Sequence, residues 1–161
     1  MGKIVTLKEL KNIRSELRLN SLKVVFTNGV FDIIHRGHVE YLQKAKSLGN
    51  VLVVGLNSDA SVRRIKGDKR PIVNQDDRAF VLSNLLMVDY VCLFEEDTPL
   101  QLISELVPDV LVKGSDWDIN DIVGRDVVEK NGGKVETIEF VPERSSTNIV
   151  DTIINRYCKG Q

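Results

Sequence analysis

The sequence has few of the residues that most often build metal sites and disulfide frameworks. Among 161 residues there are two histidines, two cysteines and one tryptophan. A zinc site usually needs three or four ligands, and no further histidine or nearby cysteine stands beside His35 and His38 to complete one. Cys92 lies in a predicted buried strand and Cys158 lies near the C-terminus. Two thiols in such different settings indicate reduced cysteines in the cytosol rather than a disulfide.

The sequence also lacks an excess of charge of one sign and any long apolar run. The 22 basic and 23 acidic residues nearly cancel, so no bulk field attracts the chain to nucleic acid or to a membrane surface. No segment approaches the ~20 apolar residues of a membrane span, and the first residues lack the apolar core of a signal peptide. We therefore expect a soluble cytoplasmic protein with neither a nucleic-acid nor a membrane partner.

What the sequence does contain is a regular alternation of strand and helix patterns. β-branched or continuously apolar runs predict strands at 22–29, 51–56, 90–94, 109–114 and 134–140. Apolar spacing and capping residues predict helices at 6–17, 37–48, 59–65, 75–86, 98–107 and 119–130, with a last helix starting near 145–147. This order predicts an α/β protein with a doubly wound, five-stranded parallel sheet covered by helices on both faces. No linker divides the chain, so we expect a single domain over 1–161, with its core at 23–157 and an N-terminal helix at 6–17.

Both histidines stand in one short turn, at the predicted carboxyl end of the first strand. In such a sheet, ligands bind at the carboxyl ends of the strands. Gly37 allows close backbone approach, and the start of the next helix supplies free N–H groups and partial positive charge. The turn therefore predicts an anion site, although two ordinary histidines remain the simpler alternative. Neither GxxxxGK[ST] nor GxGxxG occurs, so the common phosphate loops do not explain the site.

The segment "GVFDIIHRGH" resembles the GxFDxxHxGH signature of the HxGH nucleotidyltransferases, a family that includes glycerol-3-phosphate cytidylyltransferase and phosphopantetheine adenylyltransferase. The segments "LNSDASVRRIKGDKRPI", "DTPLQLISELVPDVLVKGSDW" and "SSTNIV" extend the resemblance to the nucleotidyltransferase domains of ADP-heptose synthases. The resemblance covers 23–154 and implies a Rossmann-like nucleotidyltransferase fold.

The resemblance implies transfer of AMP from ATP to a sugar 1-phosphate, such as heptose 1-phosphate, with release of pyrophosphate. The acceptor phosphate is already an anionic nucleophile, so alignment and charge stabilisation at the α-phosphate become the main tasks. Mg²⁺ is expected because ATP carries it, and the sequence shows no cage of carboxylates that would hold it. The resemblance also implies a separate sugar kinase that supplies the acceptor, since no kinase part is present in this sequence, and it leaves a homo-oligomer open.

The resemblance further implies a role for each of a set of residues. Those implied for catalysis are His35, His38 and Lys66. Those implied for nucleotide binding are Val30, Phe31, His35, Gly37, His38, Lys69, Arg144, Ser145, Ser146 and Thr147. Those implied for acceptor binding are Asp32, Lys66, Arg78, Asp116 and Trp117.

Several of these residues have other interpretations. Asp32 could instead orient Lys66, and Arg78 could instead form an ion pair with Asp76, Asp77 or Asp89. The turn at 145–147 could be only a helix cap.

Other functions also remain open. The first is a cytidylyltransferase for glycerol 3-phosphate, or another nucleotidyltransferase that forms a cofactor. A fragment of a class I synthetase is disfavoured because no KMSKS loop is present. A non-catalytic nucleotide sensor is disfavoured because the histidine and serine/threonine motifs are intact.

Overall fold

The computed structural model describes residues 1–115, 118–139 and 145–158. Its strands are β1 (Lys3–Ile4), β2 (Val24–Gly29), β3 (Val51–Asn57), β4 (Tyr90–Phe94), β5 (Val110–Gly114) and β6 (Lys134–Ile138). Its helices are α1 (Leu7–Leu19), α2 (Arg36–Lys46), α3 (Asp59–Lys66), α4 (Gln75–Ser83), α5 (Leu100–Leu106), α6 (Arg125–Lys130) and α7 (Ser146–Tyr157), with a 3₁₀ turn η1 (Ile119–Asp121).

In the described residues these strands form one sheet in the order β1-β4-β3-β2-β5-β6, and every neighbouring pair is parallel. The α/β class and the doubly wound arrangement are confirmed, but the predicted strand number is wrong because β1 forms a sixth strand. β1 pairs Lys3 with Tyr90 and Ile4 with Val91. Two residues are too few to show the alternation by which a strand is recognised in a sequence.

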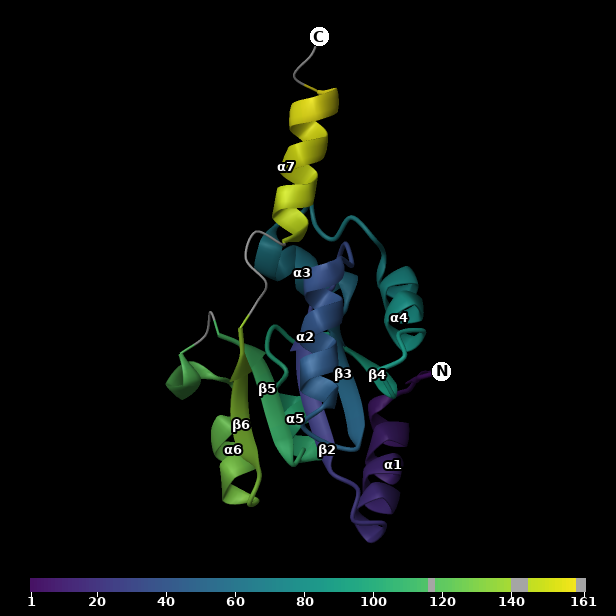
Figure 1. Ribbon diagram of the computed structural model, residues 1–161, viewed down its shortest axis with the longest axis vertical. Helices are drawn as coiled ribbons and strands as arrows, with labels where there is room; N and C mark the ends of the chain where they lie inside the picture. Colours follow the sequence, from purple (N-terminus) through teal and green to yellow (C-terminus); the bar gives the residue numbers. More distant parts are fainter. Residues whose placement is uncertain (116–117, 140–144, 159–161) are drawn as a thin grey trace.

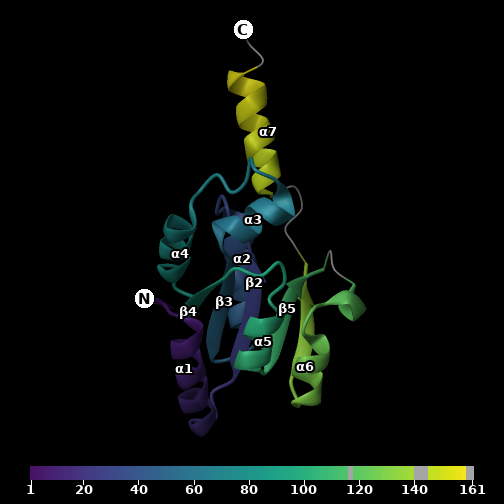
Figure 2. The same cartoon turned by 180° about the vertical axis from the view of Figure 1, so that it is seen from behind.

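The strands β2, β3, β4 and β5 send alternate side chains to two separate cores. Val24 and Phe26 of β2 pack in the core that contains Leu10 of α1, and α5 and α6 lie over this face (Figure 2). Val25 packs in the opposite core with Leu42 of α2, which crosses the other face (Figure 1). The continuous apolar runs of β2 and β3 follow from this burial on both faces.

The helix boundaries follow local capping chemistry. Thr6 begins α1 with a capping box, in which its hydroxyl accepts from the Glu9 N–H and the Glu9 carboxylate accepts from the Thr6 N–H. The predicted helix at 119–130 is divided into η1 and α6. Gly124 separates them at φ +86°, where a Cβ would lie 2.8 Å from Ile103.

Two other predicted helix ends are shifted. α4 ends at Ser83 rather than near 86. Pro99 is the N-cap of α5 and makes no side-chain hydrogen bond, so this helix begins at Leu100 rather than at 98.

Two elements lie beyond the carboxyl edge of the sheet. Figures 1 and 2 both place α3 at this edge and show α7 continuing past it, away from the sheet. No residue of α7 is buried. The carboxyl edge is therefore the part of the fold where segments from the middle and the end of the chain meet.

The two cysteines are free thiols, with Cys92 buried in β4 and Cys158 exposed after α7. Burial, with smaller contributions from Glu9 and Glu96, raises the pKa of Cys92 to about 11. This group is therefore an uncharged part of the core.

Candidate active site

A cavity of about 900 Å³ lies at the carboxyl ends of the strands. It is lined by residues from the loops that follow β2, β3, β4 and β5, and by the start of α7. The chain passes from the central strand β2 outward through β3 and β4, and then returns to place β5 on the other side of β2. The cavity thus occupies the switch point of a doubly wound sheet, where ligands of this fold class bind.

His35 forms the N-cap of α2 at one side of this cavity. Its backbone is extended, and its Nδ1 accepts a hydrogen bond from the Gly37 N–H at 3.1 Å. Because Nδ1 is the acceptor, the ring proton of neutral His35 lies on Nε2. A fixed donor at the start of a helix is suited to an oxygen of a phosphate group.

His38 lies one turn into α2 with its ring stacked on that of His35. The ring centroids are 4.0 Å apart, and the Phe31 ring lies 5.2 Å from His38. Burial first, and the neighbouring His35 second, lower the pKa of His38 to about 4. Its Nδ1 is buried, and no described residue forms a hydrogen bond with it. His38 is therefore a neutral imidazole near pH 7, able to donate a hydrogen bond without carrying a full charge.

The turn that leads to the histidines has an unusual backbone. Phe31 adopts φ +47°, a left-handed conformation that is strained for a bulky residue. Gly29 lies against the Phe31 ring, and a Cβ at that position would approach the ring to 3.0 Å. The strained turn brings the backbone of Val30 and Phe31 to the cavity.

The start of α7 closes another side of the cavity. The Ser145 hydroxyl caps the helix by accepting from the Asn148 N–H at 3.1 Å. The Ser146 hydroxyl donates to the Ile33 carbonyl oxygen at 3.2 Å. This contact brings the predicted serine/threonine turn to the histidine turn from the other end of the chain, so the N-termini of α2 and α7 face one cavity.

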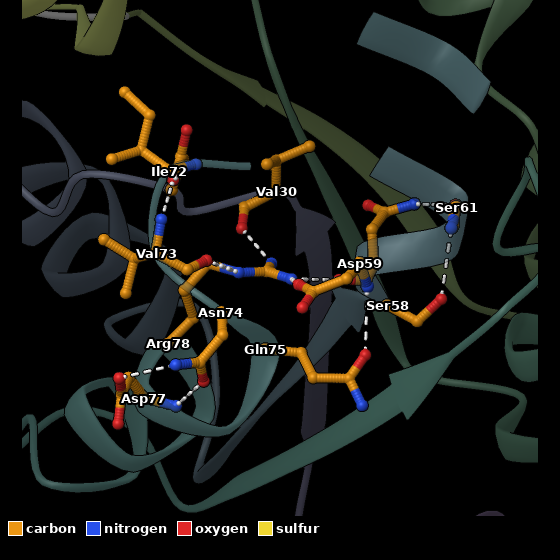
Figure 3. A network of polar contacts seen from close by, with 12 residues as sticks. Val30, Ser58, Asp59, Ser61, Ile72, Val73, Asn74, Gln75, Asp77 and Arg78 are labelled. Atoms are coloured by element: carbon orange, nitrogen blue, oxygen red, sulfur yellow. Dashed lines mark hydrogen bonds and ion pairs between the residues drawn. The ribbon is translucent and has the colours of Figure 1, made fainter. Parts of the chain in front are cut away.

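The opposite wall depends on a buried arginine (Figure 3). The Arg78 side chain is 0% exposed and forms an ion pair with Asp59 at 2.7 Å. It also donates to the carbonyl oxygens of Val30, Asn57 and Val73 at 2.6–2.9 Å. Arg78 therefore ties together the loop after β2, the end of β3 and the segment before α4. Its ion-pair partner differs from the three aspartates that the sequence suggested.

Asp32 forms a second tie between the same loops. Its carboxylate is 4% exposed and accepts from the Arg70 guanidinium at 2.6 Å. It also accepts from the N–H groups of Ile72 and Val73 at 2.8 and 2.9 Å. Burial alone would raise the pKa of Asp32, but the Val73 N–H, Arg70 and the Ile72 N–H together lower it. The alternative interpretation that Asp32 orients Lys66 is wrong, since the partners of its carboxylate lie at 70–73.

The structure brings most of the predicted site residues together, although their chemical roles stay predictions. Those that line the cavity are Val30, Phe31, Asp32, His35, Gly37, His38, Lys66, Ser145, Ser146 and Thr147. Lys69 is exposed and Arg78 is buried, and neither lines the cavity. Asp116, Trp117 and Arg144 lie outside the described residues.

Sequence reasoning missed several polar residues of the cavity, among them Lys113, Asn28 and Arg70. Lys113 at the end of β5 donates to the Asn28 side chain at the end of β2, at 2.5 Å. Arg70 lies on the loop after α3 and also lines the cavity. A usable signal was present for the first two, because a polar residue in the last positions of a buried parallel strand faces the ligand edge.

Two features bear on metal and membrane binding within the described residues. These residues contain no group of three or more His, Cys, Asp or Glu side chains that could hold a metal ion. No described helix combines the length and the apolar character that crossing a bilayer requires. The cavity carboxylates are Asp32, held by Arg70, and Asp97, paired with Arg64.

The parallel sheet, the switch-point cavity and the two helix N-termini define an α/β enzyme that handles phosphate groups. Residues 26–154 match the family described as cytidylyltransferase-like. The chain belongs to this family and is a nucleotidyltransferase.

Two curated proteins are similar to this chain over most of its length. The chain is 56% identical over 156 residues to the bifunctional protein HldE of Geobacter metallireducens, an alignment that covers 97% of this chain and 32% of that protein. It is 54% identical over 151 residues to the bifunctional protein HldE of Campylobacter concisus, covering 94% of this chain and 31% of that protein. The chain therefore corresponds to only part of these relatives.

Solved structures agree on the fold. A lipopolysaccharide core biosynthesis protein from Thermoplasma volcanium matches with a TM-score of 0.61 and 32% identity, over 74% of this chain and 97% of that one. Pantothenate synthetase from Thermus thermophilus matches with a TM-score of 0.62 and 18% identity, over 91% of this chain and 67% of that one. The second likeness shows the shared fold alone.

Proposed function

We propose that the protein is an adenylyltransferase that moves AMP from ATP to a sugar 1-phosphate, heptose 1-phosphate, giving ADP-heptose and pyrophosphate. The observation that carries this proposal is the stacked pair His35–His38, set between two helix N-termini in one cavity. The identity to HldE proteins and the likeness to a lipopolysaccharide core biosynthesis protein support a sugar phosphate as the acceptor.

The reaction is a direct displacement at the α-phosphate of ATP. An oxygen of the acceptor phosphate forms the new bond to the α-phosphorus, while the bond to the bridging oxygen breaks and its electron pair leaves with pyrophosphate. The acceptor oxygen is already anionic, so no general base is needed, and catalysis consists of alignment and electrostatic stabilisation. His35 donates from Nε2, and the neutral His38 donates to charge that shifts towards the leaving group.

The other predicted site residues bind either the outer phosphates of ATP or the acceptor. Ser145, Ser146 and Thr147, with the N-terminus of α7, hold the outer phosphates of ATP. Lys66 lies at the end of α3 on the cavity wall and faces the acceptor, and Lys69 adds positive charge near the nucleotide. ATP would enter as its magnesium complex, and its phosphates and water would hold the ion, since the two cavity carboxylates among the described residues, Asp32 and Asp97, already have partners in the chain.

The biological setting belongs to the same proposal. The acceptor comes from a sugar kinase, and the reaction takes place in the cytoplasm. A homo-oligomer remains an open prediction.

Pyrophosphate release tests the proposal, measured with ATP or CTP against heptose 1-phosphate, mannose 1-phosphate and glycerol 3-phosphate. The proposal expects release with ATP and heptose 1-phosphate, and loss of that release in His38→Ala. Preference for CTP with glycerol 3-phosphate would instead establish the alternative that the family's name suggests. Absence of release with every pair would remove both.

A further inference from the structure

One cation of the cavity wall is fixed by the chain before any ligand arrives. Arg70 lines the cavity, and its side chain is 18% exposed. One of its Nη atoms donates to Asp32, the one hydrogen-bond partner of this side chain among the described residues. A guanidinium carries five N–H donors in a rigid plane, so most of them remain available to a ligand.

The carboxylate that holds Arg70 is itself held. Asp32 accepts from Ile72 and Val73 as well as from Arg70, and Arg78 joins the two loops again through the carbonyl oxygens of Val30 and Val73. These contacts fix the loop at 70–73 against the turn that precedes the histidines. Lys66, by contrast, is an exposed residue at the last position of α3.

The proposed reaction brings two phosphate-bearing molecules into one cavity. The N-termini of α2 and α7, with the histidines and Ser145–Thr147, provide for the triphosphate. Arg70 enters from the loop between β3 and β4, on the β3 side of the central strand, whereas β6, the strand that precedes α7 in the chain, lies on the other side. The phosphate group of the acceptor therefore has a fixed cationic partner, Arg70, that is separate from the groups facing the triphosphate.

On the basis of the proposed function, we infer that Arg70 binds the phosphate group of the acceptor and that Asp32 is a positioning residue which acts through Arg70. A planar guanidinium makes paired hydrogen bonds with two oxygens of a phosphate monoester, which fixes the direction of the attacking oxygen as well as its distance. This pairing selects phosphorylated acceptors over free sugars. Asp32 therefore does not contact the acceptor, because its carboxylate is already filled by three donors of the chain.

The test measures the effect of each variant on the sugar phosphate and on ATP separately, by calorimetry for binding and by steady-state kinetics for KM. Arg70→Gln keeps an amide donor for Asp32 and removes the charge. Arg63→Gln is the matched control, since Arg63 is exposed on α3 and does not line the cavity. Arg70→Gln should weaken acceptor binding and raise its KM at least tenfold, while binding of a non-hydrolysable ATP analogue changes less than threefold. Arg63→Gln should change both less than twofold.

Equal weakening of both substrates by Arg70→Gln, or an effect no larger than that of Arg63→Gln, would overturn the assignment. Arg70→Lys, which keeps the charge without the planar fork, should retain part of the acceptor affinity and provides a folded variant if Arg70→Gln is unstable.

The positioning role of Asp32 is tested by comparing the effect of Asp32→Asn on the acceptor KM in the wild type and in the Arg70→Gln variant. Asp32→Asn alone should raise the KM for the acceptor several-fold, but in the Arg70→Gln background it should change that KM less than twofold. A full multiplicative effect in the double variant would mean that Asp32 contacts the acceptor itself.

Failure of the proposed function is distinguishable from failure of this inference. If the wild type releases no pyrophosphate, inorganic phosphate and glycerol 3-phosphate are titrated calorimetrically in the presence of the ATP analogue. Binding that Arg70→Gln weakens tenfold supports the phosphate site without the reaction. No binding to the wild type, or binding unchanged in Arg70→Gln, overturns it.

Discussion

The two walls of the cavity are built in opposite ways. The β3-side wall, formed by the loops at 30–32 and 70–73, is tied together by a buried arginine and a buried aspartate. The α7 wall has no buried residue in its helix, and one of its side-chain contacts with the rest of the described chain is the hydrogen bond from Ser146 to Ile33. We therefore expect the first wall to share the stability of the core, and the α7 wall to open at a lower free-energy cost than global unfolding.

Loss of Arg78 should break the first wall and produce the largest effect on stability. Arg78→Met removes a fully buried cation and leaves Asp59 and three carbonyl oxygens without their partner. We expect the free energy of unfolding to fall by about 3–5 kcal/mol. Urea unfolding measures it, with Arg63→Met as the exposed control, expected within about 0.5 kcal/mol of wild type. A loss below about 1 kcal/mol for Arg78→Met would show that the wall does not depend on this residue.

The histidine turn lies between the two walls and should affect rate far more than stability. His35→Ala and His38→Ala should each lower kcat by about 10²–10³, the usual cost of losing a transition-state donor. Steady-state pyrophosphate release gives kcat, and urea unfolding shows whether each variant remains folded. A variant that keeps near-normal kcat would lose its catalytic assignment.

The buried imidazole should make stability depend on pH. The pKa of His38 is lowered to about 4 in the folded state from an ordinary 6.5. The unfolded chain therefore binds the proton more strongly, so this contribution is complete above pH 6.5 and is lost as pH falls towards 4. From pH 7 to pH 5, wild type should lose about 1–2 kcal/mol more than His38→Gln. Parallel pH dependence in the two proteins would contradict a neutral His38, and His35→Gln tests the contribution of its neighbour.

The α7 wall should show the smallest effect on global stability. Ser145→Ala removes the cap of α7, and Thr6→Ala removes the comparable cap of α1, whose Leu10 is in the core. A cap contributes about 1 kcal/mol. Thr6→Ala should lower the unfolding free energy by about that amount. Ser145→Ala should leave it nearly unchanged but speed amide exchange across α7. Equal global losses would mean that α7 is coupled to the core as strongly as α1.

Much of this fold follows from local sequence patterns, because strands buried on both faces and capped helices leave strong signals. Thr6 with Glu9 and the β-branched run before Asn28 are examples. The break at Gly124 was not predictable, since it depends on the contact with Ile103 from another element.

The candidate site also contains residues that the sequence predicts and residues that it does not. The histidine turn could be found because its residues are adjacent in the sequence. The burial of Arg78 could not, because its partners at 30, 57, 59 and 73 become neighbours only in the folded chain. Arg70 was visible as a charge, but the sequence alone does not show that Asp32 would select it over Lys66 and Lys69.

The contact between Ser146 and Ile33 spans 113 positions of the chain. During synthesis on the ribosome, the histidine turn emerges before the serine turn, which follows only after β6 has been made. The two imidazoles are thus made before the segment that we propose as the second half of the phosphate site. We therefore expect the proposed triphosphate site to form only after all six strands of the described sheet have been made.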